Sequence, residues 1–337
     1  MMKKILAAAI VSAFAAPAFA ATANVDVYGK LHMSVNYFDD QPSAINDVGI
    51  SSNASRIGFK GAEDLGGGLS AIWQIEQTVN LDEANAGTFA SRNSFIGLKG
   101  GFGTALIGRH DTPLKLVGRS VDLFGDTMAD SRNVMAGGSD TRANNVAVYM
   151  TPNMGGFGIA AAYSTDLGNS GAASDADNSG VYNLNATYNN GPLFLGLGYG
   201  DGDGHEKIGL GAHMRAAAGF TMGSLKFVGQ FDKLKGDNLV INPKGDYEAW
   251  MVGGAFTMGN IVLKANYMEG DFDHAADPKQ WTVGADYNLS KRSSVYALYA
   301  NGENITIGGG AGTSDQVASG SASGDISVIS LGMIHTF

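Results

Sequence analysis

Three aspartates follow one another at four-residue intervals: Asp122, Asp126 and Asp130. They lie in the longest irregular stretch of the chain, about residues 111–141. A stretch of that length without regular structure is unusual in a compact domain and is usually functional where it occurs. If a short helix forms there, the four-residue spacing places the three carboxylates on one side of it. The sequence therefore predicts an acidic face on a long loop.

Basic groups occur in alternating segments before and after this stretch. Arg56 and Lys60 alternate with Ile57 and Phe59, so a strand there has one basic and one apolar face. Glu76 alternates in the same way with its apolar neighbours. We expect the strands that carry these groups to form a wall facing the loop. The candidates chosen on alternation are Arg56, Lys60, Glu76 and Arg92, and those chosen because they flank the long stretch are Arg109 and Arg142.

Acids on a loop and bases on a wall suit the selection of ions rather than catalysis. Across a narrow gap of water they create a transverse electric field, which low-dielectric walls focus. The simpler interpretation of each arginine is a salt bridge that only pins the loop. Both roles can hold together.

Residues with the spacing of a catalytic or metal site are not apparent. The Asp201-Gly202-Asp203-Gly204 segment resembles a calcium-loop fragment but lacks the later ligands. The six histidines show no metal-ligand pairing, and the chain has no cysteine. No compact order of serine, histidine and acid suggests a hydrolase. We therefore expect no enzyme activity, no metal and no cofactor.

The elements that must position these charges alternate with period two. In residues 24–37 the odd positions are mainly apolar and the even positions mainly polar, which is typical of a half-buried strand. Fourteen residues exceed the usual globular strand of about 5–6 residues. A strand that crosses a bilayer at a tilt needs about 9–11 residues.

Short and long breaks alternate between such segments. Seven short breaks are built from glycine, asparagine, proline or serine, as in Asp64-Leu65-Gly66-Gly67-Gly68. Fifteen connections predict sixteen antiparallel strands, and this asymmetry of short turns and long loops is typical of bacterial outer-membrane barrels. A barrel of that size encloses an aqueous channel. The eight long breaks are about 38–51, 80–90, 111–141, 165–180, 201–206, 235–245, 271–279 and 302–322.

The first twenty residues have the layout of a secretory signal peptide. Lys3 and Lys4 precede an apolar run over residues 5–16, and Ala18-Phe19-Ala20 is a small-x-small cleavage signature. We expect cleavage between Ala20 and Ala21, and a single barrel domain over residues 21–337. The run is too short for a membrane-anchoring helix.

Composition is consistent with one barrel. The chain has 49 glycines, seven prolines and no internal linker. Its formal charge is -10, and removal of two lysines with the signal peptide makes it -12. An acidic chain is not expected to bind nucleic acid, which requires a basic surface.

The chain ends inside an alternating segment that stops at Phe337. Counting back from it, His335, Met333 and Leu331 share one face. We expect this last strand to pair with residues 24–37, because no strand edge can remain open to lipid.

Two motifs and the chain end resemble one family. The run Ser55-Arg56-Ile57-Gly58-Phe59-Lys60-Gly61-Ala62-Glu63-Asp64-Leu65-Gly66-Gly67-Gly68-Leu69 resembles the second strand and first turn of general-diffusion porins of the Neisseria and Burkholderia type. Gly97-Leu98-Lys99-Gly100-Gly101-Phe102-Gly103, with the following Gly108-Arg109 and Thr112-Pro113, is similar to their next hairpin. The end Gly332-Met333-Ile334-His335-Thr336-Phe337 is similar to their Gly-Leu-Arg-His-x-Phe terminus.

The resemblance implies an outer-membrane homotrimer of sixteen-stranded barrels for passive diffusion of small hydrophilic solutes and ions. It implies a third loop folded into the lumen and a constriction set by charges of that loop and of the wall. It also implies that Phe337, with His335 and Met333, forms the signal read by the barrel-assembly machinery. The other expected partners are outer-membrane lipid and lipopolysaccharide.

Alternatives remain open at this stage. A channel specific for sugars or phosphate differs only in the lumen lining. A surface adhesin or structural barrel with a plugged lumen needs a folded segment before the first strand, and only about four residues separate the expected cleavage site from that strand. Ion preference is also open, because the arginines favour anions and the acidic loops favour cations.

Overall fold

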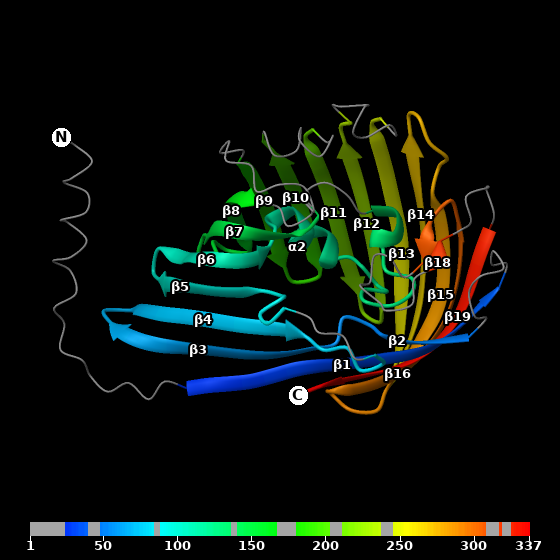
Figure 1. Ribbon diagram of the computed structural model, residues 1–337, viewed down its shortest axis with the longest axis horizontal. Coiled ribbons are helices and arrows are strands. Elements are labelled where there is room, and N and C mark those ends of the chain that lie inside the picture. The colour runs from blue at the N-terminus through cyan, green and yellow to red at the C-terminus, as the bar shows by residue number, and fades with distance from the viewer. Residues whose placement is uncertain are drawn as a thin grey trace.

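The computed structural model describes residues 24–39, 48–83, 88–135, 140–166, 180–202, 211–236, 245–307, 317–318 and 325–337. The expected signal peptide and its cleavage site lie outside these residues. Figure 1 shows a wall of long strands around short helical segments. The strands are β1 (Asn24–Asp39), β2 (Val48–Ser52), β3 (Arg56–Gly66), β4 (Leu69–Thr78), β5 (Ser94–Gly100), β6 (Gly103–Asp111), β7 (Arg142–Met150), β8 (Phe157–Asp166), β9 (Val181–Asn190), β10 (Leu193–Asp201), β11 (His213–Met222), β12 (Leu225–Leu234), β13 (Tyr247–Met258), β14 (Ile261–Phe272), β15 (Lys279–Asn288), β16 (Ser293–Glu303), β17 (Thr306–Ile307), β18 (Val317–Ala318) and β19 (Asp325–Thr336).

The large sheet is a closed antiparallel ring. Each strand pairs with its sequence neighbour, and β19 pairs with both β16 and β1, as the red and blue strands of Figure 1 show. Among the described residues this sheet has seventeen strands. Because β2 and β3 both pair with β1 and are separated only by residues 53–55, they form one interrupted strand of the ring. The barrel therefore has sixteen strands, as the sequence predicts.

Alternation along each strand separates the two faces of the wall. On β1, Val25 and Val27 are each 54% exposed on the outside, whereas His32 and Asn36 are fully buried on the inside. The outer face presents large apolar and aromatic side chains to the hydrocarbon, as barrels in membranes require. Among the described residues no helix is both long and apolar enough to cross a membrane.

The turns follow the predicted pattern, with seven short connections at one end of the barrel. In the first of them Gly66, Gly67 and Gly68 all have positive φ, between 63° and 84°. Only glycine adopts this conformation without steric cost, which explains the glycine run.

Three predictions about the connections need correction. Residues 48–51, assigned to the long loop over about 38–51, belong to β2 and extend the second strand. The last long connection, assigned as irregular over 302–322, contains the small β17–β18 hairpin. No helix forms over residues 122–130, which are turns, so the four-residue spacing of the aspartates does not act through a helix face.

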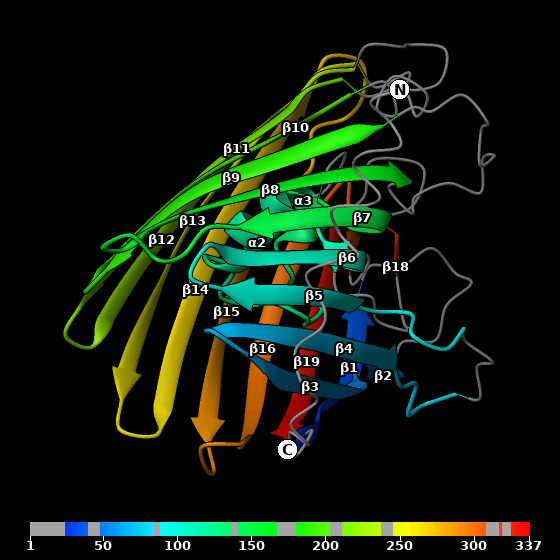
Figure 2. The ribbon, with the colours of Figure 1, turned by 90° about the vertical axis from the view of Figure 1, so that its left-hand side faces the viewer.

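The longest connection folds into the barrel. We call residues 112–141 the inner loop; its residues 136–139 are not among those described. It contains α2 (Pro113–Arg119) and α3 (Arg132–Met135). Helix α2 contacts β8 to β11, and α3 contacts β13 to β15, so the loop crosses the interior (Figure 2). Thr112 caps α2 by accepting from the Lys115 backbone N–H at 3.3 Å, and Pro113 opens the helix.

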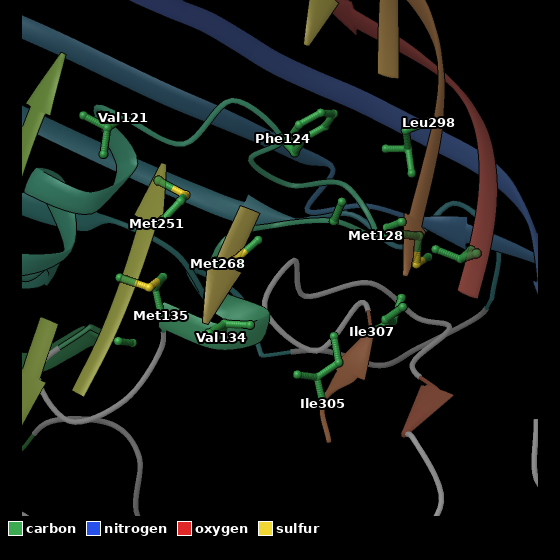
Figure 3. Packing of buried hydrophobic residues seen from close by; sticks show 14 of the residues in the cluster. Val121, Phe124, Met128, Val134, Met135, Met251, Met268, Leu298, Ile305 and Ile307 are labelled. Atoms are coloured by element: carbon green, nitrogen blue, oxygen red, sulfur yellow. The ribbon is translucent and has the colours of Figure 1, made fainter. Parts of the chain in front are cut away.

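Apolar side chains of the inner loop pack against the inside of the wall. Phe124, Met128 and Met135 are at most 1% exposed. Figure 3 shows Val134 and Met135 beside Met251 and Met268, which come from β13 and β14. The charged part of the loop lies beside this packing and reaches Lys30 of β1 and Arg56 of β3.

Candidate functional site

Asp126 of the inner loop contacts basic groups of two wall strands. Its Oδ2 lies 2.9 Å from Lys30 Nζ of β1 and 3.5 Å from Arg56 Nη1 of β3. Lys30 and Arg56 are paired in register, so both point to the same place inside the barrel. Asp126 has φ of +61°, in a turn where a neighbouring glycine lets the Arg119 guanidinium approach closely.

The inner loop supplies its own cations to its aspartates. Arg119 reaches Asp126 at 2.7 Å, Asp130 at 2.8 Å and Asp122 at 3.6 Å. Arg132 contacts Asp130 at 3.0 Å. We call this set the Asp126 cluster: Lys30, Arg56, Arg119, Asp122, Asp126, Asp130 and Arg132. It holds four cations and three carboxylates, so its net charge is positive when all are ionised.

The pKa values in this cluster diverge according to surroundings. Burial alone raises the pKa of Asp126, but Arg119, Lys30 and Arg56 outweigh it and hold that pKa well below the usual 3.8. Burial and the charge of Asp130 raise the pKa of Asp122 to about 6, although Arg119 and two backbone N–H groups oppose the shift. Two of the loop aspartates therefore differ in charge behaviour near neutral pH.

A second charged group lies where the inner loop joins the wall. Asp111 Oδ1 is 3.2 Å from Lys115 Nζ and 3.1 Å from Arg142 Nη2. Arg142 Nε also donates to Asn93 Oδ1 at 2.7 Å. We call Asp111, Lys115, Arg142 and Asn93 the Asp111 cluster. It again has one more cation than carboxylates.

Glu76 and Arg92 form a pair beside these clusters. Arg92 Nε lies 2.6 Å from Glu76 Oε1, and the Tyr28 hydroxyl donates to Glu76 Oε2 at 2.9 Å. Arg92 precedes β5 and is not part of a strand, so the alternation argument for it was wrong, although its side chain does join the inner-face pair. Lys60 lies over the Tyr28 ring, 5.2 Å from its centroid.

Arg109 differs from the prediction. In the β5–β6 ladder, Arg109 pairs with Ser94 and Ile107 with Ile96, so strict pairing puts Arg109 on the face of the two isoleucines. Both isoleucines are at least 60% exposed on the outside. Arg109 lines an outer cavity of about 680 Å³ with them, where the β6–β7 register shifts. Sequence spacing does not reveal this face, because the strand is too irregular there to extrapolate alternation.

Exposure separates the bases from the acids. The Arg119 and Arg56 side chains are 27% and 24% exposed, whereas Asp126 is 9% and Asp130 is 0% exposed. The expected arrangement had acids and bases facing each other across water. Instead, the acids contact the bases directly and lie behind them. The part of the Asp126 cluster that meets the lumen is therefore mainly basic, whereas in the Asp111 cluster the acid and its two bases are similarly exposed.

Several residues of this site were not identified from the sequence. Lys30 lies on the inner face of the first strand, but its partner Asp126 is 96 positions further along the chain and could not be predicted. Arg119 and Arg132 lie within the irregular stretch, where no periodicity shows side-chain direction. Buried Arg215 of β11 also binds the inner loop. Among the described residues no group of three or more histidine, aspartate or glutamate side chains is arranged to hold a metal ion.

The chain end lies where the ring closes. Gly29 and Phe337 exchange both backbone hydrogen bonds, at 3.0 and 3.2 Å. The His335 ring Nδ1 lies 2.8 Å from the Ser293 hydroxyl. Met333 pairs with Met33 and is exposed on the outer face. These contacts join the last strand to both of its neighbours.

Comparison with known proteins agrees with this architecture. The family model described as Gram-negative porin matches residues 7–306. The chain is 32% identical to outer membrane porin protein 32 of Delftia acidovorans over 91% of this chain and 92% of that protein. It is also 32% identical to the major outer membrane protein P.IB of Neisseria meningitidis serogroup B, over 92% and 98%.

Solved structures show the same barrel. An anion-selective porin from Comamonas acidovorans has a TM-score of 0.76 and 28% identity, covering 94% of this chain and all of that one. The trimer form of OmpT from Vibrio cholerae has a TM-score of 0.66 at 19% identity, covering 94% and 99%, which supports the fold alone. Porins are channels without catalytic activity. The sixteen-stranded ring, the inner loop and these matches show that the chain belongs to the Gram-negative porin family and forms an outer-membrane diffusion channel.

Proposed function

We propose that the inner loop and the wall of β1 and β3 form the constriction of this channel, and that it passes small hydrophilic solutes with a preference for anions. The observation that carries the proposal is the order of charges by depth. Arg56 and Arg119 meet the lumen, and Asp126 and Asp130 lie behind them. A solute in the gap therefore meets cations first.

Charge count supports the same preference. The Asp126 cluster and the Asp111 cluster each contain one more cation than carboxylates, while the Glu76–Arg92 pair is neutral. Low-dielectric walls focus this field into the water between them. The net charge of -10 belongs to the whole chain, so the surplus acids lie outside these clusters. Their field is screened over a Debye length of about 8 Å at physiological ionic strength. The related anion-selective structure is consistent with this assignment.

Removal of one base from each cluster tests the proposal. The purified, folded protein is inserted in a planar bilayer, and the zero-current potential is measured under a KCl gradient before and after Arg56→Ala with Arg142→Ala. The expected result is a clear shift away from chloride preference. An unchanged potential in a variant that still conducts contradicts the constriction assignment. A matched control is Lys233→Ala, because Lys233 forms an exposed pair with Glu248 away from the inner loop.

We also infer a homotrimer, cleavage of residues 1–20 before assembly, and contact with outer-membrane lipid and lipopolysaccharide. The trimer is what the resemblance to general-diffusion porins implies, and the trimer form of OmpT shows that this fold can assemble in that way. The cleavage rests on the Ala18-Phe19-Ala20 signature. We expect the barrel-assembly machinery to recognise Phe337, His335 and Met333. Mass measurement of the mature chain and chemical cross-linking in intact membranes test the first two inferences.

A further inference from the structure

Arg215 lies nearly half-way around the ring from the Asp126 cluster, and all of its donors are used. Its Nε donates to Asp232 Oδ1 at 2.8 Å, and Nη2 donates to Asp232 Oδ2 at 2.5 Å and to the Met135 carbonyl at 2.8 Å. Its Nη1 donates to the Asp140 carboxylate and, at 3.5 Å, to the Leu114 carbonyl. A guanidinium has five N–H donors, so each has an acceptor here.

These acceptors join separate parts of the inner loop to the wall. Leu114 belongs to α2, Met135 ends α3, and Asp140 lies just before the loop returns to β7. Asp232 belongs to β12, which pairs with β11 so that Arg215 stands opposite Asp232. One wall side chain therefore holds the beginning and the end of the loop at a single point.

The loop is shaped to admit this guanidinium. Gly118 lies in α2, and a Cβ there would overlap Arg215 Nη1 and come within 3.2 Å of the Gln230 side-chain oxygen. Alanine is the better helix former, so helix stability does not explain a glycine at this position. The close approach of Arg215 does explain it.

The ion pairs of Arg215 are buried, so their role differs from that of the bases that face the lumen. The Arg215 side chain has no exposed surface, and those of Asp140 and Asp232 are 2% exposed. The group cannot meet a solute. A buried, hydrogen-bonded ion pair instead fixes geometry, and loss of one partner leaves an uncompensated charge.

We propose that Arg215 is a positioning residue, which clamps both ends of the inner loop to β11 and β12 and thereby keeps the open channel at constant width. Without the clamp the loop is still tethered by the Asp126 cluster, and each end keeps wall contacts of its own, through Asn183 and Asn185 at α2 and through Tyr247 at α3. The two ends are then no longer joined through one side chain, so they fluctuate more relative to each other. The ionic current then fluctuates with them. The inference rests on the proposed constriction, because the moving loop must border the narrowest part of the channel.

The sharpest test adds one methyl group and no charge. Gly118→Ala displaces the guanidinium, whereas Gly219→Ala is the matched control, since a Cβ there meets its nearest atom at an ordinary 3.7 Å. Single-channel recordings at constant voltage give the variance of the open current and the frequency of brief closures. We expect both to rise several-fold in Gly118→Ala and to stay at wild-type values in Gly219→Ala. The zero-current potential of the fully open level should be unchanged, because no charge is altered.

Arg215→Lys is the second variant. Lysine keeps the charge but has three donors without the planar fork, so it cannot satisfy both Asp232 oxygens and the loop acceptors together. The same noisy current is expected, with the heat resistance of the folded barrel in detergent retained. If this variant does not assemble, Gly118→Ala decides the question.

Wild-type-like steady current in Gly118→Ala overturns the clamp. A general loss of stability is distinguished by Gly29→Ala, which is also overpacked but lies on β1, away from Arg215. A steady current in Gly29→Ala beside a noisy current in Gly118→Ala assigns the noise to the clamp, whereas equal noise in both variants contradicts it. Failure of the proposed constriction is seen in a separate experiment. In that case the Arg56→Ala, Arg142→Ala double variant has the same zero-current potential as the wild-type channel.

Discussion

Depth below the lumen surface distinguishes the charged residues of this channel. Arg119 contacts three carboxylates yet remains 27% exposed, while Asp130, one of its partners, has no exposed side-chain surface. An ion pair of this kind holds the loop and also leaves a positive face to the water. Pinning and selection, which the sequence leaves as alternatives for each arginine, are therefore compatible in one group.

Proton binding at Asp122 gives a prediction at this scale. Its pKa is raised to about 6 from the ordinary 3.8 by burial and by the charge of Asp130. The folded protein therefore takes up a proton as the pH falls from 7 to 5, and uptake in this window stabilises the folded loop. The loss of one negative charge should increase chloride preference. Zero-current potentials at pH 7 and pH 5 measure the change, and Asp122→Asn should remove it.

Asp126 responds in the opposite sense. Its folded-state pKa is depressed, so the stabilisation from its ion pairs is fully present above the unfolded value of 3.8 and is lost as the pH falls below it. We expect the loop to stay anchored down to about pH 4 and then to loosen. Current variance recorded between pH 5 and pH 3 is the measurement. A rise that begins already near pH 6 contradicts the role given to Asp126.

At the scale of elements, alternation predicted most of the wall. Residues 24–37 were identified as the first strand because their two faces differ, and β1 extends only two residues further. The interruption of the second strand was missed, since residues 48–52 contain serines and glycine that are also typical of loops. The inner loop was identified in the sequence by its length. Its contacts with the wall could not be predicted, because pairs such as Lys30 and Asp126 are far apart in the sequence.

Closure of the ring gives a prediction at the element scale. A Cβ on Gly29 would lie 2.8 Å from the Arg56 carbonyl oxygen and overlap the Phe337 ring. Overpacking of this kind typically costs about 1–3 kcal/mol. Gly29→Ala should therefore lower the temperature at which the barrel unfolds in a detergent gel. Gly229→Ala is the control, because its new Cβ meets only the Met251 carbonyl at 3.6 Å. Equal unfolding temperatures for the two variants contradict the closing role of Gly29.

At the scale of the whole molecule, overall charge and channel charge have opposite signs. The chain carries -10, yet the Asp126 and Asp111 clusters each have a surplus cation. Composition therefore excluded nucleic-acid binding but gave no prediction of ion preference. That property depends on which charges the inner loop brings to the lumen and which it buries, and only the folded arrangement shows this.

The trimer gives a prediction at the same scale. If three copies assemble, each with its own channel, one insertion event should close in three equal current steps at high voltage. Cross-linked protein from membranes should migrate as three chains. A single closing step together with an uncross-linked monomer contradicts the inferred assembly.

The central claim is that exposed bases over buried acids make the channel prefer anions. The zero-current potential of the wild-type protein under a KCl gradient at pH 7 tests it most directly. A potential with the sign of chloride preference is the predicted result, and a potential with the sign of potassium preference contradicts the claim.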